Sequence, residues 1–258
     1  MRIGVCVSAR QLVPEVTGLD FLEGTVPEVL CPLEPESAFA DRLATVKSMA
    51  LPMEATNRLF PRQLKTTGPD VDRQALDRYI ATACRRAERI GIKVIVFGAG
   101  GSRNVPEGFG HREALGQLAD HLGRWGLMAQ RAGLVIVLEP LHRNETNIIN
   151  SVSEAAELAR QVDQANIRIL ADTYHMGKEN EGVEGIIAAG TGLLHHVHCA
   201  DPAGRAPLGF GPADHRPYFR ALKDICYDAR VSIEAVWQDF PAQLPAAVAA
   251  LRRQIDTA

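Results

Sequence analysis

Cysteine is scarce in this sequence, and uninterrupted hydrophobic runs are short. The five cysteines are an odd number, and no two of them have the Cys-x-x-Cys spacing of a zinc ribbon. A disulfide framework is therefore not expected, and this cysteine usage is typical of a reducing compartment. No apolar run approaches the roughly 18 residues that a membrane-spanning helix needs, so we expect no membrane partner.

An excess of charge of one sign is also lacking. The sequence has 28 Lys and Arg residues against 31 Asp and Glu residues, a net charge of −3 at pH 7. Nucleic-acid-binding proteins usually carry a basic field, so we expect no nucleic acid as partner. The first eight residues contain an apolar run shorter than the core of a signal peptide, and no small-residue cleavage site follows it. We therefore expect a cytoplasmic protein.

The remaining composition is ordinary for a globular chain, with 46% hydrophobic and 23% charged residues. A chain of 258 residues can bury roughly three quarters of its unfolded surface, so it needs no disulfides to fold. We find no linker, internal repeat or low-complexity tract, and we expect a single domain over residues 1–258.

Short β-branched runs alternate with longer segments of helical periodicity. The predicted strands lie at 3–7, 19–23, 51–56, 92–98, 134–139, 167–172, 193–198 and 231–236. The fourth and fifth are nearly continuous apolar runs, as in parallel strands that are buried on both faces.

Helical patterns fill most of the intervals between these strands. One helix is predicted from Asp70, as N-cap, to Gly91, and a second begins at the capping box of Ser151 and Glu154. Further helices are predicted at 111–131, 217–228 and 243–255, whereas residues 8–18 are too few for a full helix. Eight strands separated by helices favour a (β/α)₈ TIM barrel with a shortened first helix over an open sheet.

Four of the predicted strands end on residues that commonly bind metals: Glu139, Asp172, His198 and Glu234. Successive members are 33, 26 and 36 positions apart, about one βα unit each. The C-terminal strand ends of such a barrel form one rim, so we expect the four side chains to meet there. Three clustered carboxylates call for a cation, and three oxygens with one imidazole nitrogen suit Mn²⁺, Mg²⁺ or Co²⁺, with Zn²⁺ as an alternative.

The segments around these residues resemble the sugar isomerase/epimerase family, whose barrel is similar to that of xylose isomerase. This family includes ketose 3-epimerases and hydroxypyruvate isomerases. The C-terminal segments that carry the resemblance are LEPL at Glu139, ADTYHM at Asp172, HVHCAD at His198, GFGPAD and SIEAVW at Glu234. The N-terminal half contributes EATNRLFP (54–61), TGPDVDRQALDRYI (67–80) and FGAGGSRNVPEGF (97–109).

The resemblance implies roles for individual residues. Glu139, Asp172, His198 and Glu234 match the family's metal ligands, and the two glutamates match its proton-exchanging pair. The resemblance also assigns substrate oxygens to Glu145, His175 and Arg205. This chain reads LEPLHRNE where many epimerases read LEPLNRFE, so His142 takes the place of an asparagine, and we expect it to bind substrate as well.

We therefore predict a divalent-metal-dependent isomerase or epimerase of a sugar or related polyol ketone, acting through an enediolate. His142 favours one alternative on the same scaffold, a lyase or dehydratase acting on a keto-sugar or keto-glycoside. A remoter alternative is a nuclease resembling the abasic-site endonucleases, which the net charge opposes. A non-catalytic, partner-binding barrel is disfavoured by the complete set of four ligands. A homo-oligomer is compatible with the sequence.

Two further features lie beside these strand ends. His196 alternates with His198, so it is predicted to lie on the same face of the strand, as a core or supporting residue, with Cys199 on the other face. The run from Gly98 to Ser102 follows a strand and either cradles an anion or makes a closely packed βα turn.

Overall fold

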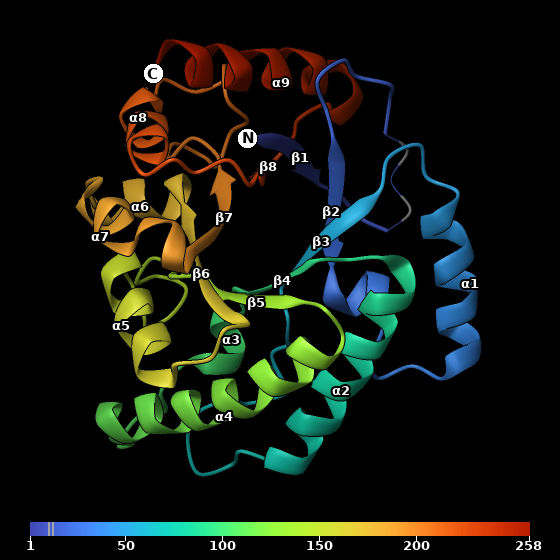
Figure 1. Ribbon diagram of the computed structural model, residues 1–258, viewed down its shortest axis with the longest axis vertical. Helices are drawn as coiled ribbons and strands as arrows, with labels where there is room; N and C mark the ends of the chain where they lie inside the picture. The colour runs from blue at the N-terminus through green and yellow to red at the C-terminus, as the bar shows by residue number, and fades with distance from the viewer. Residues whose placement is uncertain (10, 12) are drawn as a thin grey trace.

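The strands of the protein close into a barrel at the centre of the molecule. A computed structural model describes residues 1–9, 11 and 13–258. Its eight strands pair in parallel and in sequence order, and β8 pairs with β1 to complete the circle. The strands are β1 (Arg2–Cys6), β2 (Phe21–Thr25), β3 (Met53–Asn57), β4 (Val94–Phe97), β5 (Val135–Leu138), β6 (Ile167–Asp172), β7 (Leu194–Cys199) and β8 (Arg230–Ile233). The predicted (β/α)₈ barrel is confirmed (Figure 1).

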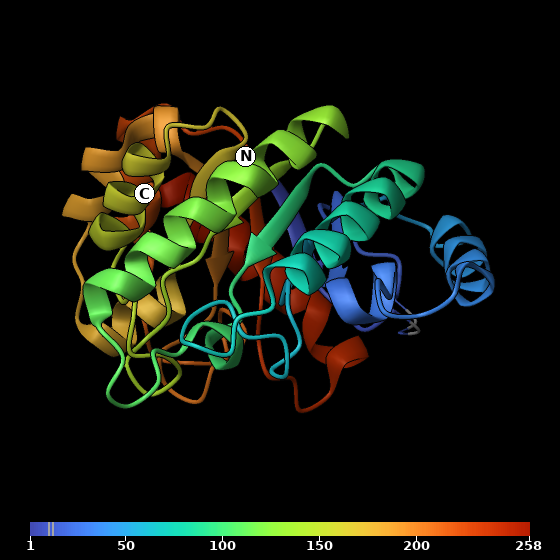
Figure 2. The same ribbon diagram turned by 90° about the horizontal axis from the view of Figure 1, so that it is seen from below.

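Helices surround the barrel, as the two perpendicular views show (Figures 1 and 2). They are the π-helix η1 (Val26–Leu30), α1 (Glu36–Lys47), α2 (Arg73–Ile90), α3 (Gly100–Arg103), α4 (His111–Arg131), α5 (Val152–Val162), α6 (Thr173–Glu179), α7 (Glu184–Leu193), α8 (Arg216–Asp224) and α9 (Phe240–Thr257). A shortened first helix was predicted between β1 and β2, but the described residues there form no helix. None of the helices in the described part of the chain is long and apolar enough to cross a membrane.

Two predicted helix ends are confirmed. The Ser151 hydroxyl accepts a hydrogen bond from the Glu154 amide at 3.1 Å and begins α5. Gly91 ends α2 with a φ of +98°, in the left-handed region that a glycine adopts at little cost.

Three predicted helix limits are wrong, each for a local reason. The N-cap of α2 is Asp72 and not Asp70, because the Asp72 carboxylate accepts the Ala75 amide at 2.9 Å. α8 ends at Asp224 and does not reach 228, because Cys226 adopts a left-handed φ of +58°. α9 begins three residues before position 243, where Asp239 caps it.

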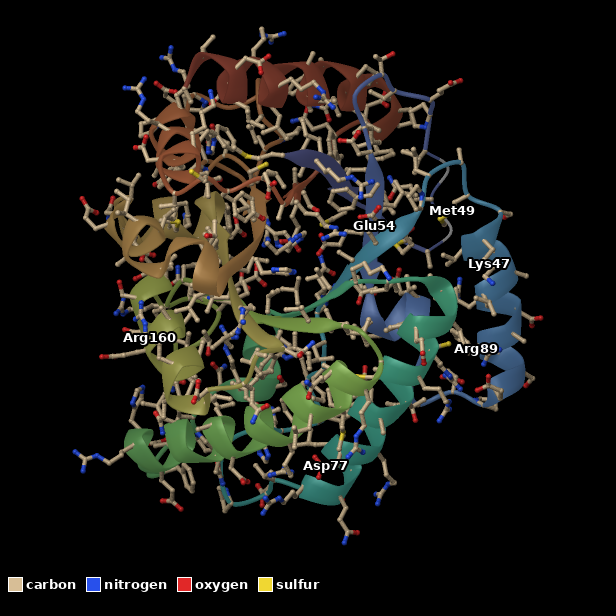
Figure 3. The ribbon with its side chains drawn as sticks, viewed as in Figure 1. Lys47, Met49, Glu54, Asp77, Arg89 and Arg160 are labelled. Carbon is tan, nitrogen blue, oxygen red and sulfur yellow. The ribbon has the colours of Figure 1, made fainter. Side chains whose placement is uncertain are left out.

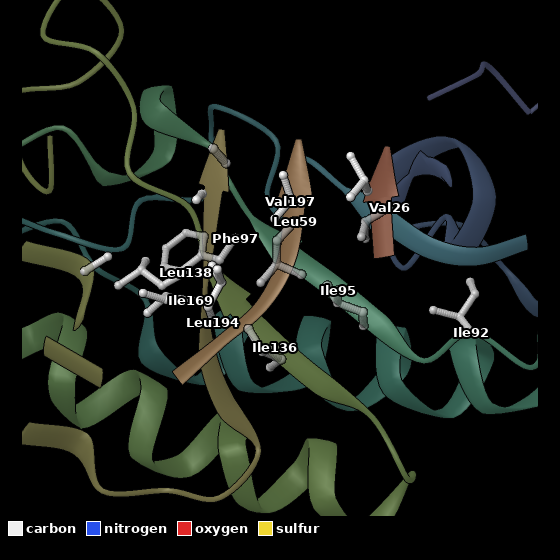
Figure 4. Close-up of a cluster of buried hydrophobic side chains, with 14 of the residues drawn as sticks. Val26, Leu59, Ile92, Ile95, Phe97, Ile136, Leu138, Ile169, Leu194 and Val197 are labelled. Atoms are coloured by element: carbon white, nitrogen blue, oxygen red, sulfur yellow. The ribbon is translucent and has the colours of Figure 1, made fainter. Parts of the chain in front are cut away.

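The apolar core has two layers. Inside the barrel lie Phe21, Ala55, Val94, Val96, Val137 and Leu170. A larger layer packs between the strands and the helices, and Figure 4 shows Phe97, Leu138 and Ile169 of three neighbouring strands within it. Cys199 belongs to this outer layer, whereas His198 beside it faces the site described below, so the predicted alternation along β7 is confirmed.

Charged residues close the barrel at the N-terminal ends of the strands. Glu54, labelled in Figure 3, accepts hydrogen bonds from Arg2 Nη1 at 2.5 and 2.6 Å and from Arg230 Nε at 2.8 Å. Arg2 and Arg230 begin β1 and β8, so these ion pairs lie at the end of the barrel opposite the C-terminal ends of the strands. The polar groups at the C-terminal ends are therefore the candidates for function.

Candidate metal centre

The C-terminal ends of four neighbouring strands bring Glu139, Asp172, His198 and Glu234 together. One ligand-type atom from each lies within 4.8 Å of the other three. His198 Nδ1 is 3.1 Å from Glu139 Oε1 and 3.0 Å from Glu234 Oε2. Asp172 and His198 lie inside β6 and β7, whereas each glutamate follows its strand by one residue.

Burial and charge set the ionisation of this group. Burial raises the pKa of Asp172 to about 7 and also raises the pKa of Glu139. Burial alone would raise the pKa of Glu234 as well, but His198 and Arg205 hold it well below its usual range. Added positive charge would therefore favour ionisation of Asp172 and Glu139, which burial opposes.

A divalent cation fits this arrangement. Asp172 Oδ1 accepts the Tyr174 amide at 2.8 Å, whereas Asp172 Oδ2 is buried and has no hydrogen-bond partner in the described structure. An orphaned carboxylate oxygen is costly, and coordination to a cation would satisfy it. Three carboxylates and one imidazole are also a donor set typical of divalent metal sites.

The βα turn after β4 shapes the space around Glu139. A side chain on Gly98 would place its Cβ 1.5 Å from Glu139 Oε2, so only glycine leaves room for this carboxylate. Arg103 is fully buried and donates from Nη1 to the Phe97 carbonyl at 2.8 Å and from Nη2 to the Glu139 carbonyl at 2.6 Å. The run from Gly98 to Ser102 thus makes the closely packed turn.

Arg205 lies between the candidate ligands and the predicted substrate residues. Its Nη2 is 2.5 Å from Glu234 Oε2 and 3.6 Å from Asp172 Oδ2, and its Nη1 is 3.8 Å from Glu145 Oε1. Its guanidinium carbon is 4.5 Å from the centre of the Tyr174 ring. These contacts hold the Arg205 guanidinium beside the candidate ligands, where its N–H groups can bind substrate oxygens.

His142 and His175 form a buried imidazole pair. Their Nδ1 atoms are 2.7 Å apart, and the His142 amide donates to His175 Nδ1 at 3.2 Å. His175 Nε2 lies 3.6 Å from Asp172 Oδ2, and His142 Nδ1 lies 3.7 Å from Glu145 Oε1. In this series of polar contacts, His175 therefore lies between His142 and the candidate metal ligand Asp172.

The sequence analysis missed Glu23, the middle residue of β2. This side chain is fully buried and accepts hydrogen bonds from His196 Nε2 at 2.8 Å, His198 Nε2 at 2.9 Å and Ser232 Oγ at 2.6 Å. The rule that identified the other acids, a carboxylate at the end of a predicted strand, applies equally to Glu23 at the end of 19–23. Asn57, also missed, donates from Nδ2 to Glu234 Oε1 at 3.1 Å.

Comparison with protein families gives one match that spans most of the chain. The model described as "Xylose isomerase-like TIM barrel" matches residues 40–254. A solved structure of a D-allulose 3-epimerase from Methylomonas sp. superposes with a TM-score of 0.81 at 21% identity, covering 98% of each chain. At this identity the superposition supports the fold alone.

Curated relatives match over shorter segments. An L-ribulose 3-epimerase from Methylomonas sp. (strain DH-1) is 34% identical over 47% of this chain and 40% of its own length. A 3-dehydro-D-guloside 4-epimerase from Escherichia coli (strain K12) is 32% identical over 45% of this chain and 44% of its own length. The chain thus matches less than half the length of either relative.

Proposed function

Because the chain belongs to the xylose isomerase-like TIM barrel family, we propose that it is a divalent-metal-dependent epimerase or isomerase of a sugar or related polyol ketone. Its distant relatives are sugar epimerases, which supports this reaction class. The proposed metal ligands are Glu139, Asp172, His198 and Glu234. Mn²⁺, Mg²⁺ and Co²⁺ suit this oxygen-rich donor set, and Zn²⁺ is the alternative.

One observation carries the proposal. Glu139 and Glu234, which directly follow β5 and β8, both approach the same atom, His198 Nδ1, at 3.1 and 3.0 Å. Two carboxyl groups beside one candidate cation position are what a proton transfer next to a carbonyl requires, because one group removes the proton and another returns it.

The chemistry divides between the cation and the chain. A bound divalent cation would supply Lewis-acid stabilisation of the enediolate, worth several kcal/mol. One glutamate removes the proton from the carbon next to the carbonyl, which contributes roughly 10²–10⁴-fold to the rate, and the second glutamate returns a proton. Return to the opposite face of the same carbon gives an epimer, and return to the neighbouring carbon gives an isomer.

Arg205, His175 and Glu145 are the proposed substrate residues. The Arg205 guanidinium donates to hydroxyl or carbonyl oxygens, and Glu145, whose side chain is 41% exposed, accepts from hydroxyl groups. His142 holds the His175 ring through their 2.7 Å contact and so orients it.

A lyase or dehydratase remains the second candidate, and the same contact supports it. A second imidazole behind His175 could deliver a proton to a leaving group at the β-position. The epimerase is favoured because His142 makes no hydrogen bond or ion pair with a proposed metal ligand in the described structure.

Deuterium exchange tests the proposal. The protein, loaded with Mn²⁺, is incubated in D₂O with a panel of free ketoses and 3-keto-glycosides, and the products are read by NMR. We expect deuterium on a carbon next to the carbonyl, together with an epimer or isomer. A cleaved or unsaturated product without either would establish the lyase, and no exchange with any member of the panel would contradict the proposal.

Glu234→Gln provides the matched test of mechanism, and Glu157→Gln is its control. We expect the first variant to suppress exchange, and its metal content is measured alongside because Glu234 is also a proposed ligand. Glu157 is an exposed glutamate on α5, outside the barrel, so its substitution should leave exchange unchanged.

A further inference from the structure

Glu23, on β2, accepts hydrogen bonds from residues of two other strands of the barrel, β7 and β8. Its Oε1 accepts from His198 Nε2 on β7, and its Oε2 accepts from His196 Nε2 on β7 and from Ser232 Oγ on β8. All four residues are completely buried. Because a buried carboxylate is costly unless hydrogen bonds satisfy it, this network fixes Glu23 in one orientation.

The network determines which nitrogen of His198 faces the candidate metal position. Since Nε2 donates its proton to Glu23 at 2.9 Å, a neutral His198 carries its lone pair on Nδ1. Nδ1 is the atom that lies 3.0–3.1 Å from Glu139 and Glu234. The lone pair of His198 and the oxygens of two glutamates thus point toward one another, and either a proton on Nδ1 or a metal cation between them would satisfy all three.

We infer that Glu23 is a positioning residue that holds His198 with Nδ1 toward the metal and thereby raises the metal affinity of the centre. This inference rests on the proposed metal centre. A carboxylate that accepts the second N–H of a metal-bound imidazole fixes its ring and tautomer, and loss of such a partner typically costs 10–100-fold in affinity.

His196 and Ser232 hold the other oxygen of Glu23. Their hydrogen bonds to Oε2 keep the carboxylate from rotating and leave Oε1 for His198. Removing the Ser232 hydroxyl deletes one of these bonds without touching the bond to His198. Ser232→Ala therefore shows how much the hold on Oε2 contributes, separately from the bond between Glu23 and His198.

Metal titration tests the inference. The dissociation constant of Co²⁺ is measured for the full-length wild-type chain and for Glu23→Gln, Glu23→Met and Ser232→Ala. We expect Co²⁺ binding to weaken about 10-fold in Glu23→Gln, where an amide oxygen can still accept from His198, and about 100-fold in Glu23→Met. Ser232→Ala should weaken binding less than either Glu23 variant, because His196 still holds Oε2 and the bond to His198 is intact. Wild-type affinity in both Glu23 variants, with melting temperatures that show them folded, would overturn the inference.

A second measurement needs no variant of Glu23. The wild-type protein, labelled with ¹⁵N-histidine and loaded with ¹¹³Cd²⁺, is studied by NMR, and His198 is assigned as the signal missing from His198→Gln. We expect ¹¹³Cd coupling to Nδ1 and a proton retained on Nε2, where the Glu23 carboxylate accepts its hydrogen bond. Coupling to Nε2 would overturn the inference and leave the proposed function standing. A wild-type protein that binds neither Co²⁺ nor Cd²⁺ would overturn the metal centre itself.

Discussion

The guanidinium of Arg205 forms an ion pair with Glu234, with 2.5 Å between Nη2 and Oε2. The same nitrogen lies 3.6 Å from Asp172 Oδ2, so one cation of the chain already offsets part of the negative charge of the candidate ligands. Arg205 adopts a left-handed φ of +53°, and its carbonyl accepts the Val236 amide at 2.8 Å. A backbone in this costly conformation is maintained by its surroundings, which is common at functional sites.

Replacing Arg205 should separate substrate binding from metal binding. For Arg205→Ala we expect kcat/KM to fall about 100-fold, because a charged donor to substrate oxygens is lost. The affinity for Mn²⁺ should hold or rise, since Glu234 and Asp172 lose a competing positive charge. Kinetics on the accepted ketose and a Mn²⁺ titration give the two readouts. Arg216→Ala, which breaks an exposed ion pair with Asp214, is the control, and an unchanged kcat/KM in Arg205→Ala would refute the assignment.

Asp172 has two functions that a single substitution can distinguish. Its Oδ1 caps α6 through the Tyr174 amide, and its Oδ2 faces the candidate metal position without a partner in the described structure. Asp172→Asn keeps an oxygen for the cap but removes the charge. We expect a loss of bound metal, measured by elemental analysis after stringent dialysis, with a melting temperature close to that of the wild type. Equal metal content in both proteins would remove Asp172 from the ligand set.

The barrel and its rim of acids could be predicted because each depends on a local pattern. A β-branched run is enough to predict a strand. Residues at or near the C-terminal end of such a run can then be identified without any knowledge of contacts, and they are Glu139, Asp172, His198 and Glu234. α1 was not predicted because it buries only Phe39 and Val46, which is too little for an amphipathic stripe.

The network of Glu23 was out of reach for a different reason. Its histidine partners lie 173 and 175 residues further along the chain, and its serine partner lies 209 residues away. The strand-end rule would place Glu23 at the same rim, but no periodicity or spacing pairs it with particular residues that far along the chain. Only closure of the barrel brings β2 across from β7 and β8. The same holds for the contact of Gly98 with Glu139, which makes that glycine part of the site.

Gly98→Ala tests this close approach. A methyl group on residue 98 would lie 1.5 Å from Glu139 Oε2, so the carboxylate has to move. We expect both metal affinity and turnover to fall by about 10-fold or more, since a displacement of about 1 Å at a reacting group is already costly. Gly116→Ala is the control, because Gly116 is exposed on α4 with nothing within 4 Å of its added Cβ, and alanine should stabilise the helix by about 0.5–1 kcal/mol. Unchanged metal binding in Gly98→Ala would contradict the expectation.

Glu181 should give the stability of the protein a pH dependence near neutrality. Burial, and after it the neighbouring Glu154, Glu179 and Glu184, raises the pKa of Glu181 to about 7 from 4.5. The folded state therefore holds a proton that the unfolded state releases above pH 4.5, so the contribution of Glu181 to stability is fully present below that pH and is lost as the pH rises through 7.

Because Glu181 is partly exposed, we expect this loss to be about 1 kcal/mol. Glu181→Gln keeps an oxygen for the Val152 amide, which Glu181 Oε1 accepts at 2.8 Å, and should flatten the decline between pH 5 and pH 8. Urea denaturation at several pH values measures both proteins. Parallel declines in the wild type and the variant would show that another group titrates.

Substitutions of His142 distinguish the epimerase from the lyase. Its ring contacts His175 at 2.7 Å and no proposed metal ligand within the described residues, so an epimerase should need it only for orientation. We expect His142→Asn, which restores the asparagine of the LEPLN pattern, to retain deuterium exchange with less than about a 10-fold loss of kcat/KM. His142→Ala should lose somewhat more kcat/KM, through a higher KM, because His175 then lacks a partner.

A lyase that uses His142 as its acid would instead lose turnover in both variants, by the roughly 10²–10⁴-fold that general acid catalysis contributes. If both variants still exchange deuterium and form the epimer, His142 is not catalytic. If a folded, metal-loaded His142→Asn variant has no turnover, the lyase becomes the better account.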